Sequence, residues 1–75
     1  MVRNRTEFHL VPYNDRWQIK RNGQPVFEIP TKAEAEKKAE AEARLAHPSQ
    51  LFIHNADGTI ADERTYDADP FPPRG

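Results

Sequence analysis

The chain has no cysteine, a single serine and only three glycines among its 75 residues, so few side chains suit covalent chemistry. Without cysteine, neither a disulfide nor a thiol nucleophile is available. The sequence also lacks an apolar run approaching the roughly 20 residues that a membrane-spanning helix needs. Its first residues, Met1 to Arg5, lack the apolar stretch of a secretory signal. We therefore expect a cytoplasmic protein.

The apolar residues that are present suffice for one modest core. They make up 36% of the sequence, and a chain of this size buries only about 60–65% of its unfolded surface. We expect a single small domain over residues 1–75, with a proline-rich tail at 67–75. A domain this small gains stability from every aromatic side chain that packs onto it, or from pairing with a second copy.

An alanine-rich run predicts one helix from about Thr31 to His47. Thr31 and Glu34 have the spacing of a capping box, and Pro48 prevents the helix from continuing. On its exposed side, the expected ion pairs four residues apart are Glu34–Lys38 and Glu40–Arg44. The stripe that faces the rest of the protein consists of Ala35, Ala39, Ala43 and Ala46.

Short alternating segments, separated by turn residues, predict strands on both sides of this helix. The expected strands are 7–13, 17–21, 26–29, 50–54 and 59–65. Turn sequences between them are Asn14 to Arg16, Asn22-Gly23 and Asn55 to Gly58. The predicted order is β-β-β-α-β-β, an α+β fold in which one helix packs across one face of a small, mostly antiparallel sheet.

Alternation along the strands separates a buried face from a second face. The predicted core comprises Phe8, Leu10, Trp17, Ile19, Phe27, Ile29, Ala35, Ala39, Ala43, Leu51, Ile53 and Ile60. The second face carries His9, Val11 and Tyr13 on the first strand, and Phe52 and His54 on the strand that follows the helix.

The net charge of −1 is unevenly distributed along the chain. Residues 1–25 carry five basic and two acidic side chains, a net +3, whereas residues 26–75 carry six basic and ten acidic ones, a net −4. A molecule polarised in this way suits an anionic partner or a second copy of itself. The plainer interpretation is that these charges only solvate the surface.

No arrangement of residues indicates catalysis, so we expect a non-enzymatic protein without a cofactor. Ser49 is the only serine, and no histidine and aspartate stand at a spacing that would activate it. His9 and His54 lie on predicted strands and come close if those strands pair. With Asp57 they form a candidate metal-ligand set, but no local histidine spacing supports it, and we predict no metal site.

The chain resembles the small bacterial proteins grouped as domain of unknown function 2188. The resemblance extends over most of the sequence and rests on the order and spacing of short motifs: Phe8 to Pro12, Trp17-x-Ile19-Lys20, Thr31 with Ala35, Ala39 and Ala43, Leu51-x-Ile53-His54 with Gly58 and Ile60, and Asp69 to Gly75. Because this family has no assigned activity, the resemblance implies a fold and a bacterial or phage origin, and it assigns no catalytic residues.

Two function classes follow from these observations. The first is a protein-interaction or self-assembling module, with an unidentified protein or a second copy bound through an open sheet edge. The alternative is a nucleic-acid or anion-binding module on the basic N-terminal hairpin, which uses Arg3, Arg5, His9, Tyr13, Arg16, Lys20 and Arg21. The net negative charge counts against this alternative.

The proline-rich tail has two interpretations. As a stiff extended ligand, it would present a partner-binding segment consisting of Pro70, Phe71, Pro72, Pro73 and Arg74. The second interpretation, which we favour, is that Tyr66 and Phe71 fold back over the sheet edge or the Trp17 face and complete a small core.

Overall fold

Two tight turns build the first half of the protein, which is seen here in a computed structural model that describes residues 5–67. They connect three antiparallel strands, β1 (Thr6–Tyr13), β2 (Arg16–Arg21) and β3 (Gln24–Ile29). Asn14 and Asp15 have φ values of 50° and 63°, and Asn22 and Gly23 have values of 51° and 85°. Two successive left-handed residues make a turn whose twist matches that of the strands.

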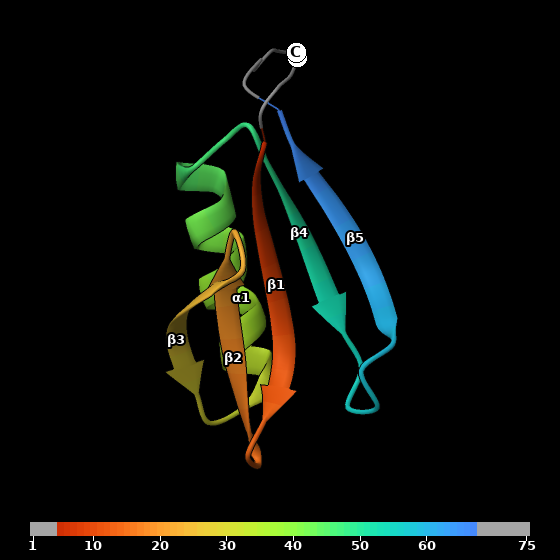
Figure 1. The fold of residues 1–75 in the computed structure, drawn as a ribbon. Helices are drawn as coiled ribbons and strands as arrows, with labels where there is room; N and C mark the ends of the chain where they lie inside the picture. The colour runs from red at the N-terminus through yellow and green to blue at the C-terminus, as the bar shows by residue number, and fades with distance from the viewer. Residues whose placement is uncertain (1–4, 68–75) are drawn as a thin grey trace.

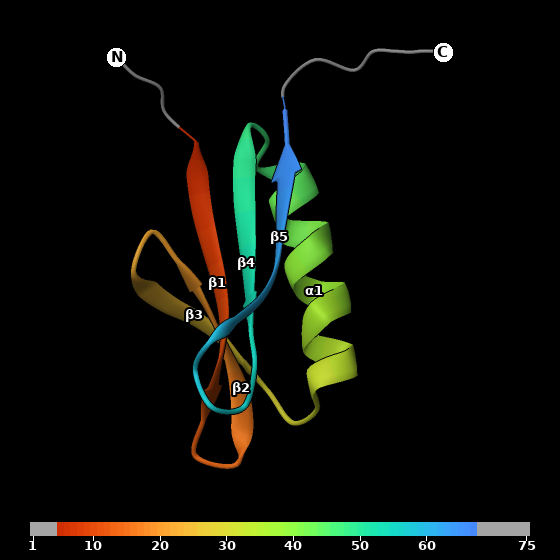
Figure 2. The same ribbon diagram turned by 90° about the vertical axis from the view of Figure 1, so that its right-hand side faces the viewer.

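The chain continues through a helix and a second hairpin, which together confirm the predicted order. These elements are α1 (Lys32–Leu45), β4 (Ser49–His54) and β5 (Ile60–Tyr66). The five strands form one sheet in the order β3-β2-β1-β4-β5, with α1 packed against one side of it, as Figure 1 and Figure 2 show. The α+β class and the single covering helix are therefore as predicted.

The sheet is mixed rather than antiparallel throughout, because β1 and β4 run parallel at its centre. The helix carries the chain back to the end of the sheet at which β1 begins, so Ser49 of β4 starts beside Thr6 of β1. A crossover helix of this kind is the usual connection between two parallel strands. The hairpin β4–β5 then adds its second strand in antiparallel pairing.

The start of α1 is capped by a threonine, and its end comes two residues before the predicted limit. The Thr31 Oγ1 atom accepts a hydrogen bond of 3.3 Å from the Glu34 backbone N–H. The Thr31 hydroxyl also donates to the Glu34 carboxylate at 3.1 Å, so the carboxylate turns to the threonine side chain rather than to its backbone. Helical conformation is disfavoured at a residue that precedes proline, and this shortens the helix before Pro48.

The core lies between the alanine stripe of α1 and the near face of the sheet. Its buried residues are Phe8, Leu10, Ile19, Ala35, Ala39, Ala43, Leu51 and Ile53. Trp17, Phe27 and Ile29 are only partly buried and pack around this cluster. The prediction of Ile60 as a core residue is wrong: its side chain is 51% exposed, because a register shift at Ile53/His54 pairs it with His54 on the other face.

Basic side chains on the helix cover the aromatic rings at the rim of the core. Lys32 lies 5.3 Å from the centre of the Trp17 ring, and Lys38 lies 4.6 Å from the centre of the Phe27 ring. Long basic side chains cover apolar surface with their methylene groups while the charge stays in water. The predicted ion pairs along the helix are replaced by others, Lys38–Glu42 at 3.4 Å and Glu40–Arg64.

The only serine of the chain has a structural place. Ser49 is fully buried at the start of β4, and its hydroxyl donates a 2.5 Å hydrogen bond to the Ala43 carbonyl near the end of the helix. The bond satisfies a carbonyl that the helix end leaves without an intrahelical partner. It fixes β4 to α1 where the crossover ends.

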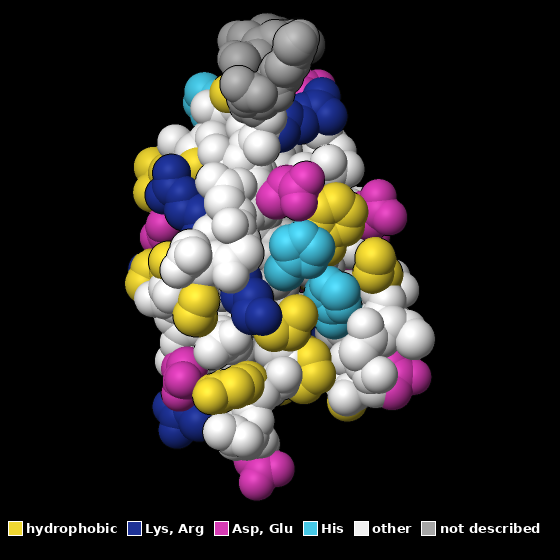
Figure 3. All heavy atoms as spheres, in the orientation of Figure 1, with side chains coloured by type: hydrophobic (Ala, Val, Ile, Leu, Met, Phe, Trp, Pro, Cys, Tyr) yellow, Lys and Arg dark blue, Asp and Glu magenta, His cyan; other side chains and the backbone are white. Residues whose placement is uncertain are grey.

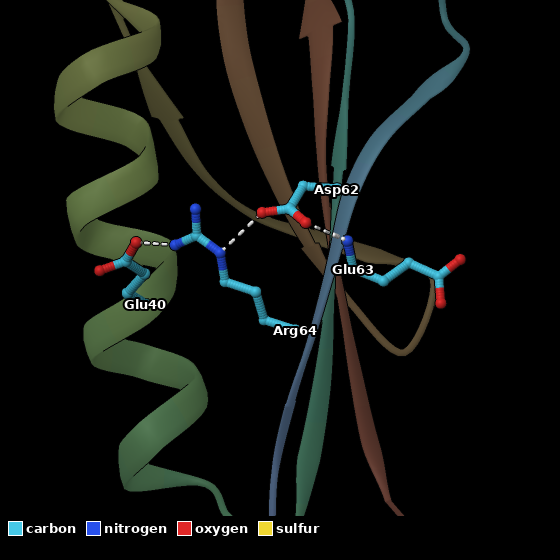
Figure 4. A network of polar contacts seen from close by, with 4 residues as sticks. All are labelled: Glu40, Asp62, Glu63 and Arg64. Carbon is cyan, nitrogen blue, oxygen red and sulfur yellow. Dashed lines mark hydrogen bonds and ion pairs between the residues drawn. The ribbon is translucent and has the colours of Figure 1, made fainter.

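The edge strand β5 is held to the helix by an arginine. Arg64 bonds Glu40 on α1, and its Nε lies 3.0 Å from the carboxylate of Asp62 (Figure 4). The hydrogen bond with Asp62, and then that with Glu40, raise the pKa of Arg64 above its ordinary value. The ring of Tyr66, at the end of the same strand, lies 5.9 Å from the Arg44 guanidinium carbon.

Candidate interaction face

Within residues 5–67, α1 covers one face of the sheet and no element covers the other. Figure 2 shows α1 beside one face of the sheet, and none of the other labelled elements lies over the opposite face. We call this uncovered surface the open face. The register of the strands places on it His9, Val11 and Tyr13 of β1, Arg16, Gln18 and Lys20 of β2, Gln50, Phe52 and His54 of β4, and Glu63 and Thr65 of β5. Because paired residues share a face, Glu7 and Glu28 also belong to it.

Two histidines and a phenylalanine occupy the centre of the open face. His9 of β1 stacks on Phe52 of β4 with ring centres 4.7 Å apart and an angle of 19° between the rings. The His9 Nδ1 atom lies 3.2 Å from the Nε2 atom of His54, the next residue of β4 on this face. Figure 3 shows two histidine side chains side by side on this face, next to hydrophobic and charged side chains. The parallel pairing of β1 with β4 creates this contact.

A carbonyl and a carboxylate flank the two imidazoles. The Nδ1 atom of His54 lies 3.0 Å from the Gly58 carbonyl oxygen. A carbonyl only accepts, so this nitrogen carries the proton. On the other side, the Nε2 atom of His9 lies 3.6 Å from a carboxylate oxygen of Glu7. The four groups form a line across the open face from β1 to the turn after β4.

Large apolar side chains surround this centre and remain in contact with water. Tyr13 is 45% exposed and Ile60 is 51% exposed. Val11 lies between Tyr13 and His9 on the same strand. A monomeric protein seldom leaves several such side chains together on one surface unless that surface binds something.

The basic residues predicted to form one patch are spread over the molecule. Lys20 and Arg16 lie on the open face, where Arg16 approaches Glu28 at 4.0 Å. Arg21 lies on the helix side, with its guanidinium carbon 5.8 Å from the centre of the Phe8 ring. Arg5 pairs with Asp67 at 2.8 Å. Arg3 and the tail residues Pro70, Phe71, Pro72, Pro73 and Arg74 lie outside the described residues.

Both edges of the sheet carry features that discourage pairing with another strand. The edge strand β3 contains Pro25, which has no backbone N–H to donate, next to a register shift in its pairing with β2. The edge strand β5 contains three successive charged residues, Asp62, Glu63 and Arg64. Proline, irregular pairing and charge on edge strands are the common means by which proteins prevent edge-to-edge association.

Asp57, the third residue of the candidate metal-ligand set that the sequence analysis set aside, is engaged within its own turn. The Asp57 carboxylate accepts from the Thr59 hydroxyl at 2.7 Å and from the Thr59 backbone N–H at 3.0 Å. These bonds, the hydroxyl first, hold the pKa of Asp57 below its ordinary value. Over residues 5–67, no group of three or more histidine, cysteine, aspartate and glutamate side chains converges.

Sequence reasoning placed Phe52 and His54 on one face but did not single out Phe52 as a functional candidate, and it also passed over Glu7. Alternation along a single strand was the available signal. It shows which residues share a face, but it does not show which strands are neighbours. The cluster depends on the register that sets His9 beside Phe52 across β1 and β4.

These observations define a class: a small α+β protein whose five-stranded mixed sheet has one face packed on a helix and the other left open by the elements of residues 5–67. The chain belongs to the family described as uncharacterized protein conserved in bacteria (DUF2188), whose model matches residues 8–66. That range begins at the third residue of β1 and ends with the last residue of β5, so the match covers five elements completely and most of β1. The resemblance found in the sequence motifs is therefore confirmed.

Comparison with curated proteins and with solved structures finds no significant match. Among the described residues, no helix is both long and apolar enough to cross a membrane.

Proposed function

We propose that this chain is a small non-enzymatic interaction module whose binding surface is the open face of the sheet. The observation that supports it is the cluster of His9, Phe52, Val11 and Tyr13 on a sheet face that no other described element covers. Aromatic side chains are enriched in the centres of protein interfaces because they bury much area at little cost in conformational entropy.

The open face is a better candidate than a sheet edge for the contact. Pairing through an edge needs free backbone N–H groups in register, and Pro25 removes one from β3. Pairing through β5 brings the charges of Asp62, Glu63 and Arg64 against the partner strand. We therefore replace the edge contact expected from the sequence with a contact between faces.

The simplest partner for this face is a second copy of the chain. Lys20 of β2 lies to one side of β1, and Glu63 of β5 lies to the other side. A two-fold axis parallel to the strands sets the β2 side of one copy over the β4–β5 side of the other. Opposite charges then meet around an apolar centre.

The test is the substitution Val11→Glu, with Leu45→Glu as the matched control. Val11 lies in the apolar cluster, whereas Leu45 is 80% exposed at the end of the helix, away from the open face. We expect the unaltered protein and Leu45→Glu to self-associate in sedimentation experiments over a concentration series, and Val11→Glu to remain monomeric. Monomers of the unaltered protein at millimolar concentration would refute self-association, and loss of association in the Leu45 variant would refute the assignment of the face.

A nucleic-acid-binding role is the second candidate, because the rings of His9, Tyr13 and Phe52 share a face with Lys20. Exposed rings on a sheet stack on unpaired bases. The open face carries two basic and three acidic side chains, which is a poor match for a phosphate backbone. Amide shifts on Lys20 and Tyr13 with short single-stranded DNA, lost between low and physiological salt, would put this role first.

We also propose a cytoplasmic location. The absence of cysteine suits a reducing compartment, where a structural disulfide does not persist.

A further inference from the structure

We propose that the His9 Nδ1 and His54 Nε2 atoms form a two-ligand site for a divalent transition-metal ion on the open face. The two nitrogens face each other across β1 and β4 at 3.2 Å. This inference does not depend on the interaction module proposed above, because it concerns the isolated chain.

The first argument concerns the positions of the protons. The protonated Nδ1 of His54 donates a hydrogen bond to the Gly58 carbonyl. The Nε2 atom of neutral His54 therefore carries no proton, and its lone pair points toward His9. The Glu7 carboxylate, 3.6 Å from His9 Nε2, favours a proton on that outer nitrogen. In the metal-free chain this 3.2 Å contact is a hydrogen bond, in which the His9 Nδ1–H donates to the His54 Nε2 atom. When the proton of neutral His9 lies on Nε2 instead, toward Glu7, both inner nitrogens offer a lone pair, and one metal ion takes the place of the hydrogen-bond proton.

The second argument is that these outer contacts are those of metal-bound histidines. A histidine ligand typically donates its other N–H to a backbone carbonyl or to a carboxylate, and this fixes the ring and its tautomer. His54 meets a carbonyl and His9 faces a carboxylate. His54 therefore already has the outer hydrogen bond of a metal ligand, and His9 has a carboxylate of the right kind 3.6 Å from its outer nitrogen.

The third argument is the separation of the two nitrogens. Two imidazoles on one tetrahedral zinc ion, with bonds of about 2.0–2.1 Å, hold their nitrogens about 3.3–3.4 Å apart. The observed separation of 3.2 Å is close to this value. The ion lies to the solvent side of the line between the nitrogens, so each ring tilts outward, a motion that the broad χ2 preference of histidine permits. Water fills the remaining coordination positions.

The chemistry of the site selects the ion. Neutral imidazole binds Zn²⁺, Ni²⁺ and Cu²⁺, whereas Mg²⁺ and Ca²⁺ require oxygen ligands. With only two protein ligands, the site binds more weakly than a closed structural zinc site. Its open coordination positions lie in the surface that we propose as an interface.

The experiment is a titration of the ¹⁵N-labelled chain with ZnCl₂, followed by imidazole nitrogen shifts and calorimetry, with MgCl₂ as the negative probe. We expect saturable Zn²⁺ binding that shifts His9 Nδ1 and His54 Nε2 most. His9→Gln and His54→Gln each remove a ligand and should weaken binding by more than the roughly tenfold that loss of an outer partner costs. The matched control is His47→Gln, which removes the third histidine near the end of the helix and should leave the affinity unchanged.

Two results would refute the proposed metal site. One is the absence of saturable Zn²⁺ binding in the unaltered protein at millimolar metal. The other is an equal loss of affinity in His47→Gln, which would show that the histidines bind independently. Because the nitrogen shifts are measured on the unaltered chain, the proposal can be tested even if a variant fails to fold. A negative result would leave the Val11→Glu experiment and its interpretation unaffected.

Discussion

Asp15 adopts a backbone conformation that glycine reaches at lower cost. Its φ of 63° follows one of 50° at Asn14, and left-handed backbone costs an L-residue roughly 1–2 kcal/mol, less for asparagine and aspartate. The turn between β2 and β3 uses asparagine and glycine for the same geometry. The first hairpin therefore closes without the residue that is best suited to it.

Asp15→Gly should raise the free energy of unfolding by about 0.5–1 kcal/mol, because the relief of strain exceeds the entropy cost of glycine. Gly23→Ala is the matched substitution with the opposite expected effect on stability. Gly23 has a φ of 85°, and no atom lies within 4 Å of the added Cβ. It should lower stability by about 1 kcal/mol through backbone strain alone. Urea denaturation of both variants measures the effects, and a loss of stability in Asp15→Gly would contradict this account of the turn.

At the scale of elements, the attachment of β5 to α1 depends on one side chain. Arg64 reaches from the edge strand to Glu40 and is held in place by Asp62 (Figure 4). The side chains of Arg64 and Glu40 are 34% and 27% exposed, whereas those of the Arg5–Asp67 pair are 46% and 60% exposed. Screening by water is weaker for the first pair.

Arg64→Ala should lower the free energy of unfolding by about 1 kcal/mol, which is near the upper end for a surface ion pair. Arg5→Ala is the comparison and should cost only a few tenths of that amount. Denaturant midpoints give both values, and amide exchange in β5 should become faster in the Arg64 variant alone. Equal costs would mean that Arg64 does not anchor the strand.

The elements with local signals are those that the sequence predicted. The Thr31 cap, the Asn22-Gly23 turn and strict alternation each act over a few residues, and they placed the helix and the strands nearly correctly. The parallel pairing of β1 with β4 and the register shift that turns Ile60 outward depend on segments far apart in the chain. For the same reason, the partner of Glu40 proved to be Arg64 and not Arg44.

At the scale of the whole molecule, stability rests on a thin core. Three of its eight buried members are alanines, and a chain of 75 residues is stable by only about 4–11 kcal/mol. Trp17, the largest side chain of the sheet, lies at the rim. The centre is formed by Leu10 and Ile19, both fully buried.

The loss in free energy of unfolding should therefore be largest for Leu10→Ala, smaller for Trp17→Ala and smallest for Ile60→Ala. Leu10→Ala should cost roughly 2–5 kcal/mol, Trp17→Ala less than that, and Ile60→Ala within about 0.5 kcal/mol of zero. Thermal and chemical unfolding give the order. If Leu10→Ala does not fold, Ile19→Val, with an expected cost of about 0.5–1.5 kcal/mol, replaces it. If Trp17→Ala is less stable than Leu10→Ala, the assignment of Leu10 to the centre of the core and of Trp17 to its rim is wrong.

The parallel seam between β1 and β4 also has a consequence for the nascent chain. During synthesis, β1, β2 and β3 leave the ribosome before β4 and β5, and each can pair with its sequence neighbour. Until β4 emerges, β1 is a terminal strand with one side unpaired. In the finished sheet, the edge strands β3 and β5 carry features that discourage pairing with another chain. Before β4 is synthesised, β1 is itself an edge strand, although it later lies at the centre of the sheet.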